Sequence, residues 1–472
     1  MLRQPGASAS LEQTTVRSAH GPAAGAETKS EHAGVSLGHP GAWRWVHVVV
    51  AALAMVLTLP GRTQGLGLFT EPLLKSLGLD RESYGFMNLW ATLLGALFCL
   101  PCGWLLDRLG TRAVLLAVTT ALGATVLAMA RWTTAAPAFP LALDLPDWIG
   151  GSVTLVVMVD LFLFLLLTRG LGQSALSVVS LALIGRSAGR RSGPAMGVYA
   201  FCSTAGFLLA FVVLGAVVKR HPDEWRSSWA GIGLTVLVLG LIGGLLVRNR
   251  FLEADPARPS TEGLTEASFT LGQALRSPSF WTFSVATSFY GMVVAGTSLF
   301  NESILAERGF DKGVFVTVTQ LGIPIGLTAN LMVGWLATRW PLGRLMALAT
   351  GLLAAALVTF PLVTTETQVY AYAAALAAAG GAITVCFFTV YRQAFGPARL
   401  GSIQGVAQML TVLFSAVGPQ VFATTQARLG SYAPLFPVFA AIALGLAVLT
   451  WIVGMPTRLA VSDIEKAKGE SP

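Results

Sequence analysis

The stretch Gly103-Trp-Leu-Leu-Asp107-Arg108-Leu-Gly110-Thr-Arg112 separates two long apolar runs near the start of the chain. Gly103 lets two helices approach closely, because glycine has no side chain. Asp107 can cap the N-terminus of a neighbouring helix, where a negative charge is favoured by about 0.3–1 kcal/mol. Arg108 and Arg112 can pair with carboxylates or face an anionic lipid surface. The stretch therefore predicts a short charged loop between two closely packed membrane helices.

Several of these features recur in the second half of the chain, at a constant offset of 231 residues (103 to 334). Thr338 stands where the first copy has Asp107, so we expect no equivalent capping role for the second copy. Repeated halves place a binding site at their interface, near the middle of the membrane. The pairs at this offset are Gly95/Gly326, Gly103/Gly334, Trp104/Trp335 and Arg108/Arg339. A second, separate echo relates Gly193/Gly197 to Gly401/Gly405.

The composition requires most of the chain to face lipid. Of its 472 residues 54% are hydrophobic and only 11% are charged, with a mean hydropathy of +0.68. A soluble protein of ordinary composition carries about a quarter charged residues. Long continuous apolar runs favour helices over the alternating strands of a membrane barrel. The predicted fold is all-α, with twelve transmembrane helices in two pseudo-symmetric halves of six. Their expected limits are 44–69, 84–106, 113–131, 153–184, 194–218, 229–248, 280–300, 314–338, 344–363, 369–391, 402–426 and 433–454.

The polar segments divide the chain into five parts. Residues 1–42 are predicted to be a disordered cytoplasmic tail, and 457–472 a second cytoplasmic tail. The two halves are expected at 43–250 and 279–456, joined by a cytoplasmic linker at 251–278. Loops on the side of the termini hold more Lys and Arg than the opposite loops, where acidic residues gather. This bias favours a cell-membrane protein with both termini in the cytoplasm.

Two arginines lie inside predicted spans. Arg62 follows Pro60 and Gly61, which interrupt the first span and free backbone groups that can line a cavity. The planar guanidinium group of Arg62 suits a carboxylate, although the side chain can instead reach the membrane surface near Glu71. Arg169 lies in the fourth span, where burial of a charge marks either a functional site or a structural pair with Asp160 or a backbone carbonyl. We expect both arginines to bind substrate.

Uncharged polar side chains in the spans complete the candidate substrate site, although such residues more often join helices to one another. Four of them accompany Arg62 and Arg169: Gln64, Asn88, Gln173 and Tyr290. Four glycine pairs have the spacing of close helix crossings: Gly61/Gly65, Gly193/Gly197, Gly322/Gly326 and Gly401/Gly405.

Other chemistries find little support in the sequence. It contains no phosphate-binding loop, no nucleophile–base set and no histidine spacing typical of a metal site. Cys99 and Cys102 form a C-x-x-C, but inside an apolar span. The net charge of +8 fits basic loops better than nucleic-acid binding. We therefore expect no enzyme activity, cofactor, metal or nucleic-acid partner, and a monomer whose partners are the bilayer and a small solute.

The chain resembles the major facilitator superfamily from about Trp43 to Met455. The resemblance rests on the twelve-span layout, the Gly103–Arg112 loop, its second copy and the Arg169 segment. It implies that the loop residues Gly103, Asp107, Arg108, Gly110 and Arg112 latch the cytoplasmic side during part of the cycle. Stretches such as Gly65–Leu74 and Phe395–Gly405 look like the monocarboxylate and oxalate/formate porter branches, which carry small organic anions.

The function expected from these observations is secondary active transport of a small organic anion by alternating access. A coupled proton or an exchanged anion would supply the driving force. Two alternatives remain open at this point. The chain could export neutral or cationic amphipathic compounds, or it could be a receptor that uses the same fold without transport.

Overall fold

The structure is a computed structural model that describes residues 40–79, 81–133, 153–187, 192–220, 224–249, 252 and 268–455. The predicted N-terminal tail up to residue 39, the tail at 457–472 and most of the predicted linker lie outside the described residues. The remaining chain forms one compact unit from Pro40 onward.

Twelve helical segments are long and apolar enough to cross a membrane, which confirms the predicted all-α fold of twelve spans. The longer helices of the first half are α1 (Pro40–Val56), α4 (Arg81–Ala96), α5 (Cys99–Leu109), α6 (Thr111–Arg131), α8 (Val153–Thr168), α9 (Ser177–Ser187), α10 (Ser192–Arg220) and α11 (Trp225–Leu246). Those of the second half are α13 (Pro278–Glu307), α14 (Lys312–Leu336), α15 (Leu342–Thr359), α16 (Glu366–Phe395), α17 (Leu400–Leu429) and α18 (Leu435–Val453), preceded by the short α12 (Leu271–Arg276).

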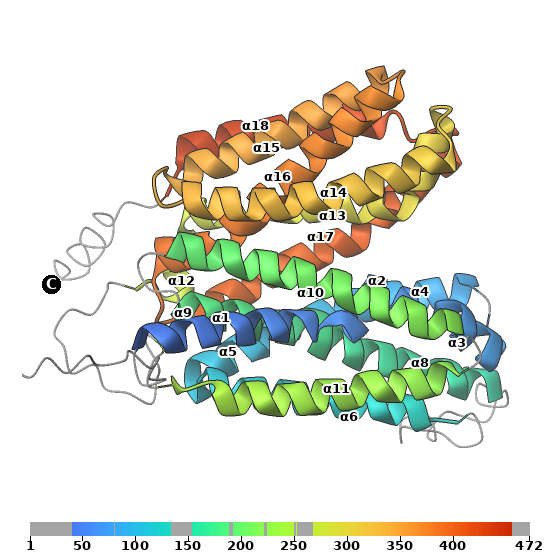
Figure 1. The fold of residues 1–472 in the computed structure, drawn as a ribbon, viewed down its shortest axis with the longest axis vertical. Coiled ribbons are helices and arrows are strands. Elements are labelled where there is room, and N and C mark those ends of the chain that lie inside the picture. The colour runs from blue at the N-terminus through green and yellow to red at the C-terminus, as the bar shows by residue number, and fades with distance from the viewer. Residues whose placement is uncertain are drawn as a thin grey trace, which may run out of the picture. The chain divides into compact units, whose positions relative to one another are not determined.

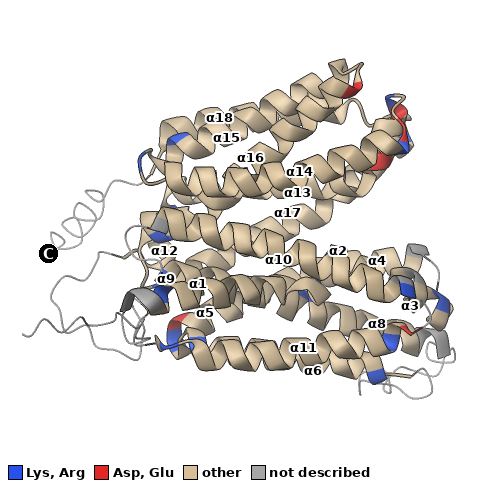
Figure 2. Ribbon diagram, viewed as in Figure 1, with Lys and Arg blue, Asp and Glu red and all other residues tan. Residues whose placement is uncertain are grey.

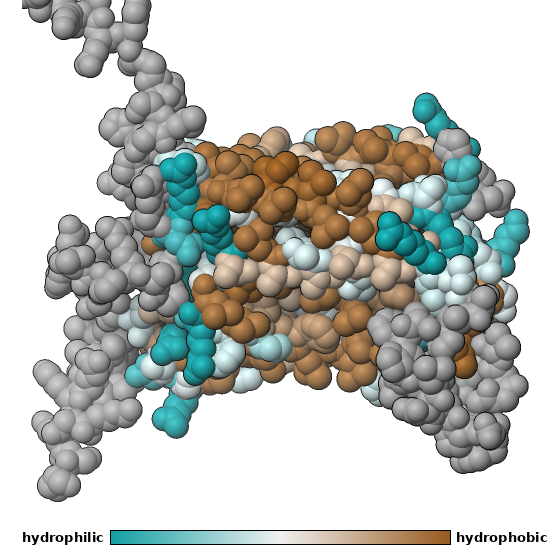
Figure 3. Space-filling view, turned by 90° about the horizontal axis from the view of Figure 1, so that it is seen from below, coloured by the Kyte–Doolittle hydropathy of each residue, from teal (hydrophilic) through white to brown (hydrophobic). Residues whose placement is uncertain are grey.

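The lipid-facing surface is apolar, because hydrocarbon offers no partner for polar groups. Leu209, Val212 and Leu241 are more than half exposed on α10 and α11, and Ile452 is 74% exposed on α18. Figure 3 shows hydrophobic side chains across the middle of one face, with hydrophilic ones gathered at its two ends. This distribution fits the predicted membrane-embedded bundle.

The first span is broken at the predicted position. Helix α1 ends at Val56, and the chain continues through a 3₁₀ turn, η1 (Leu59–Gly61), and two short helices, α2 (Thr63–Gly67) and α3 (Thr70–Leu77). Pro60 lies in the η1 turn and Arg62 adopts an extended conformation directly after it. The proline and the glycine therefore interrupt the helical hydrogen bonding at the point where Arg62 enters the bundle.

The fourth span contains a π-helix, η3 (Arg169–Leu176), between α8 and α9. The whole span runs over Val156–Ser187, 32 residues, and so is longer than one bilayer crossing requires. A π-helical turn is rare and occurs mostly at functional sites. Arg169 is the first residue of this turn, and Gly172 of the same turn packs on Gly61 of the broken first span.

The two halves meet in two related crossings, which use the glycines that recur along the sequence. In the first, α5 packs on α17, and a Cβ added to Gly103 would lie 2.5 Å from the carbonyl oxygen of Gly401. In the second, α14 packs on α10, and a Cβ added to Gly334 would lie 2.7 Å from the Cα atom of Gly197. Real Cβ atoms do not approach other atoms so closely, so each crossing requires glycine on both helices. Within the second half, α14 also crosses α16 closely near the predicted pair Gly322/Gly326, because a Cβ added to Gly381 would lie 2.7 Å from the carbonyl oxygen of Gly326. The glycine that this crossing requires is Gly381, since Cβ atoms added to Gly322 or Gly326 would make only ordinary contacts with Ala377.

Both crossings lie at one end of the bundle, which we call the signature end because it carries the Gly103–Arg112 loop. Along α10, buried side chains are frequent from Gly193 to Ser203, whereas none from Thr204 to Val218 is buried. Figure 1 shows α10 and α14 diverging away from the signature end. The halves therefore pack together at the signature end and separate toward the opposite end.

We predict that Gly401→Ala destabilises this packing, since its Cβ would lie 2.6 Å from the Gly103 carbonyl oxygen and 2.7 Å from Asp107 Oδ1. Overpacking of this kind costs about 1–3 kcal/mol. The measurement is the midpoint of thermal unfolding in detergent, with Gly445→Ala of α18 as the control, because nothing lies within 4 Å of a Cβ there. An unchanged midpoint for Gly401→Ala would contradict the close crossing.

Candidate functional site

Arg62 points into the bundle and does not reach toward the membrane surface. Its Nε donates to Thr58 Oγ1 at 2.6 Å, and its Nη2 donates to Met55 Sδ at 3.1 Å and to Ser177 Oγ at 3.2 Å. The guanidinium also lies over the ring of Phe207, 5.0 Å from its centroid. The side chain thus runs back along the first span to contact the fourth and fifth, and it stays partly exposed.

Arg169 is almost completely buried on the other side of the break, with 1% exposure. Its Nη1 donates to the carbonyl oxygen of Gly61 at 3.3 Å, to Thr63 Oγ1 at 3.0 Å and to Gln173 Oε1 at 2.9 Å. Its Nη2 donates to Asn88 Oδ1 at 2.6 Å. One guanidinium therefore joins the first, second and fourth spans.

No carboxylate neutralises either arginine among the described residues. Every hydrogen-bond partner of Arg62 and Arg169 is uncharged. Asp160, considered as a structural partner of Arg169, instead accepts a hydrogen bond from Trp132 Nε1 at 3.1 Å. Of the two structural alternatives for Arg169, the geometry supports the backbone carbonyl, that of Gly61. Two positive charges thus flank the break without a described counter-charge.

The structure brings together some of the predicted polar residues and separates others. Asn88 and Gln173 both bind Arg169, whereas Tyr290 lies in the other half, with its hydroxyl group against Gly380 of α16. No described hydrogen bond joins Tyr290 to either arginine. The side chain of Gln64 lies outside the described residues.

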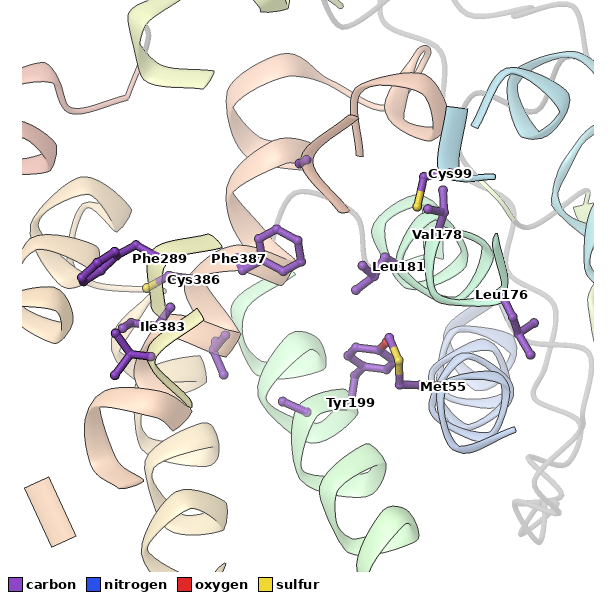
Figure 4. Packing of buried hydrophobic residues seen from close by; sticks show 14 of the residues in the cluster. Met55, Cys99, Leu176, Val178, Leu181, Tyr199, Phe289, Ile383, Cys386 and Phe387 are labelled. Atoms are coloured by element: carbon purple, nitrogen blue, oxygen red, sulfur yellow. The ribbon is translucent and has the colours of Figure 1, made fainter. Parts of the chain in front are cut away.

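Sequence reasoning missed the residues that hold Arg62. Met55, Thr58 and Ser177 carry its hydrogen bonds, and Phe207 carries its ring contact. Small hydroxyl residues and a methionine are common in membrane helices, so nothing in the sequence distinguishes them. Figure 4 shows Met55 beside Tyr199 of α10, and Tyr199 in turn shares a hydrogen bond of 2.7 Å with Ser180 of α9.

Asp107 caps a helix of the opposite half at the signature end. Its Oδ1 accepts from the Gly401 amide at 3.0 Å, and its Oδ2 accepts from the Ser402 amide at 2.8 Å and the Ser402 hydroxyl at 2.5 Å. These groups form the N-terminus of α17, where the helix dipole attracts negative charge. The capping interaction expected for Asp107 is present, and it joins the two halves.

The ion-pair partner of Asp107 is Arg186, a residue that the sequence did not single out. Arg186 Nη2 lies 2.7 Å from Asp107 Oδ1, and its Nη1 donates to the Leu106 carbonyl oxygen and to Thr111 Oγ1. Both side chains of the ion pair are 1% exposed. The position of Arg186 at the end of an unusually long span was the available signal.

The other loop residues have different surroundings. Gly110 has φ of +79°, which favours glycine, and it precedes α6. Arg108 is exposed and stacks on Trp104 at 4.1 Å, and Arg112 is exposed. The second copy repeats the stacking, with Arg339 over Trp335 at 4.0 Å, but Thr338 donates only to the Trp335 carbonyl of its own helix. The two copies of the loop share the stacking of arginine on tryptophan, and they differ because only Asp107 caps a helix of the opposite half.

Charges are distributed unequally between the two ends. Asp107 is the one carboxylate that the described residues place at the signature end, where arginines such as Arg108, Arg339 and Arg399 gather. Apart from Asp160, all the other described carboxylates, including Glu302 and Glu307, lie at the opposite end. Figure 2 shows red segments at the far ends of the second-half helices and mostly blue at the signature end.

Comparison with known proteins agrees with this architecture. The family model described as Major Facilitator Superfamily matches residues 50–419. A structure of the E. coli fucose:proton symporter superposes with a TM-score of 0.65 at 12% identity, covering 88% of this chain and all of that one. A structure of the human organic anion transporter MFSD10 superposes with a TM-score of 0.60 at 15% identity, covering 86% of this chain and 99% of that one. A structure of a bacterial homologue of the iron transporter ferroportin, in an outward-facing state, superposes with a TM-score of 0.60 at 17% identity, covering 86% of this chain and 98% of that one. No curated protein sequence matches the chain.

We predict that Asp107→Asn lowers the stability of the protein markedly, because it leaves Arg186 buried without its anion. Breaking one partner of a buried pair costs about 3–5 kcal/mol. The double variant Asp107→Asn/Arg186→Gln should lose less than the two single variants added together. Thermal unfolding in detergent measures all three variants, with the exposed Arg428→Gln as control. Strict additivity would argue against a coupled pair.

Proposed function

The chain belongs to the major facilitator superfamily, and on that premise we propose that it transports a small organic anion by alternating access. The family model covers most of the chain, and the twelve spans make it a multi-pass integral membrane protein. Members of this family bind small-molecule substrates. The observation that carries the proposed substrate class is Arg62, a residue that is only partly buried inside the bundle and whose described hydrogen-bond partners are all uncharged.

An arginine inside the bundle with no carboxylate partner among the described residues favours an anionic substrate. Burying a charge without a counter-charge is expensive, so a carboxylate that pairs with Arg62 would be strongly attracted to the site. The planar guanidinium suits a carboxylate in particular, through parallel charge-assisted hydrogen bonds. A cationic compound would be repelled by the same group. The apolar ring of Phe207 beside Arg62 can contact the hydrocarbon part of the substrate.

In the proposed cycle the two halves, 43–250 and 279–456, rock against each other while 251–278 links them. The state described here is closed at the signature end by the glycine crossings and by Asp107 on the N-terminus of α17. Opening that end requires Asp107 to leave Gly401 and Ser402, so we propose that this cap is the latch. A coupled proton or an exchanged anion would drive the cycle.

We propose that the signature end faces the cytoplasm, together with both termini. Loops rich in Lys and Arg remain on the cytoplasmic side of membrane proteins. Arginines such as Arg108, Arg339 and Arg399 gather at the signature end, and apart from Asp107 and Asp160 the described carboxylates lie at the opposite end. With this orientation, the state described here would open to the outside of the cell.

Uptake into proteoliposomes tests the anion site. We expect Arg62→Gln to reduce uptake of a labelled carboxylate by about 10- to 150-fold, since a hydrogen bond to a charged group contributes about 1.5–3 kcal/mol. Arg62→Lys should keep part of the activity, because it keeps the charge but loses the planar fork. Arg428→Gln at the opposite end serves as the control. Normal uptake by Arg62→Gln would remove Arg62 as the ligand.

Thiol labelling tests the orientation. In a variant without the four native cysteines, Arg428→Cys and Arg399→Cys place single thiols at exposed positions on the two ends. We expect a membrane-impermeant maleimide to label Arg428→Cys in intact cells, and Arg399→Cys only after permeabilisation. The reverse pattern would place the signature end outside.

A further inference from the structure

We infer that Arg62 alone binds the carboxylate of the substrate and that Arg169 is a positioning residue, which clamps the break in the first span. The site would then accept anions with one carboxylate and discriminate against those with two. This inference rests on the proposed function, and it assigns different roles to two arginines that the sequence analysis treated alike. The two guanidinium groups differ in which of their donors are engaged.

The donors of Arg169 are occupied or inaccessible. Nη1 has three acceptors, and Nη2 donates to Asn88. The Nε group has no partner among the described residues, but it is itself buried, so a ligand cannot reach it without rearrangement. With the whole residue 1% exposed, its charge is held inside the protein by neutral dipoles.

The contacts of Arg169 hold the break in shape. The η1 turn ends at Gly61, whose carbonyl oxygen accepts from Arg169 and whose Cα atom packs on Gly172. A Cβ added to Gly172 would lie 3.0 Å from the Gly61 Cα atom, so the two spans touch through their backbones. In a membrane interior, a free backbone carbonyl needs a protein partner. Arg169 supplies this partner and ties the break to Asn88 of α4.

Arg62, in contrast, keeps donors available. Its Nε and Nη2 are engaged, whereas Nη1 makes no hydrogen bond to the described residues. The side chain is also partly exposed, unlike that of Arg169. One available guanidinium can neutralise one carboxylate.

A second carboxylate on the substrate would meet no second cation. Between the two ends of the bundle, the basic residues that the structure describes are Arg62 and Arg169. If Arg169 remains in its clamp, the second negative charge must be buried without a partner, which is strongly unfavourable. The different roles of the two arginines therefore decide the substrate class.

Two isosteric substitutions test whether the charge of Arg169 is used for binding. Asn88→Asp and Gln173→Glu each place a carboxylate where Arg169 already donates, at 2.6 Å and 2.9 Å respectively. Each variant neutralises Arg169 while preserving the clamp. We expect both variants to retain carboxylate uptake well above that of Arg62→Gln, with KM raised less than about tenfold, because the substrate ligand in this inference is Arg62 and not Arg169.

Arg169→Gln should behave in the opposite way to Arg62→Lys. Loss of the clamp lets the break move, so we expect a maximal rate at least about tenfold lower with a smaller change in KM. Arg62→Lys should chiefly raise KM. If Asn88→Asp and Gln173→Glu both abolish uptake while thermal unfolding shows folded protein, the charge of Arg169 binds substrate and the inference is overturned. Should one of the two variants fail to fold, the other decides.

A panel of labelled monocarboxylates and dicarboxylates, paired by carbon number, tests the substrate class. We expect uptake of the best monocarboxylate to exceed that of its paired dicarboxylate by at least about tenfold. Equal uptake of the two would overturn the one-carboxylate inference and leave anion transport standing. No uptake of any carboxylate by the wild-type protein would overturn the proposed function itself, so the two failures are distinguishable.

Discussion

The structure depends on the requirement that every backbone polar group in hydrocarbon has a partner within the protein. This requirement makes the chain helical in each of its twelve spans, and it also determines what happens where a span is interrupted. At the η1 turn, Pro60 and Gly61 end the regular hydrogen bonding of α1, and a carbonyl oxygen becomes available. Arg169 satisfies that carbonyl from the fourth span. The break and the buried arginine are therefore parts of one arrangement.

The same requirement for hydrogen-bond partners applies at the signature end. The amides at the start of α17 have no partner within their own helix, and the carboxylate of Asp107 accepts from two of them across the boundary between the halves. The glycines at both crossings bring the backbones close enough for this contact. Arg186 of α9 neutralises this carboxylate from within the first half. Close packing and charge compensation thus cooperate at one end, while the halves separate toward the other.

The internal repeat explains why the two crossings look alike and why they differ. Gly103 and Gly334 occupy equivalent places, as do the stacked pairs Trp104–Arg108 and Trp335–Arg339. The carboxylate occurs in the first copy only, since Thr338 takes the place of Asp107 in the second. Thr338 donates to a carbonyl oxygen of its own helix, whereas Asp107 accepts across the boundary between the halves. The two crossings therefore share a steric function, and the electrostatic contact is added at the first.

The sequence by itself determined the twelve spans, the paired halves, the break beside Arg62 and the capping capacity of Asp107, because hydrophobic length, glycine spacing and proline act locally along the chain. Only the tertiary structure decided that Arg186 pairs with Asp107, that Arg62 turns back toward Met55 and Ser177, and that Asn88 and Gln173 serve Arg169 while Tyr290 lies apart. Three of these contacts, Asp107–Arg186, Asn88–Arg169 and Arg62–Ser177, join residues 79 to 115 positions apart in the chain. A side chain between several polar neighbours binds the partner that helix packing brings within hydrogen-bond distance, and that distance is not a property of sequence.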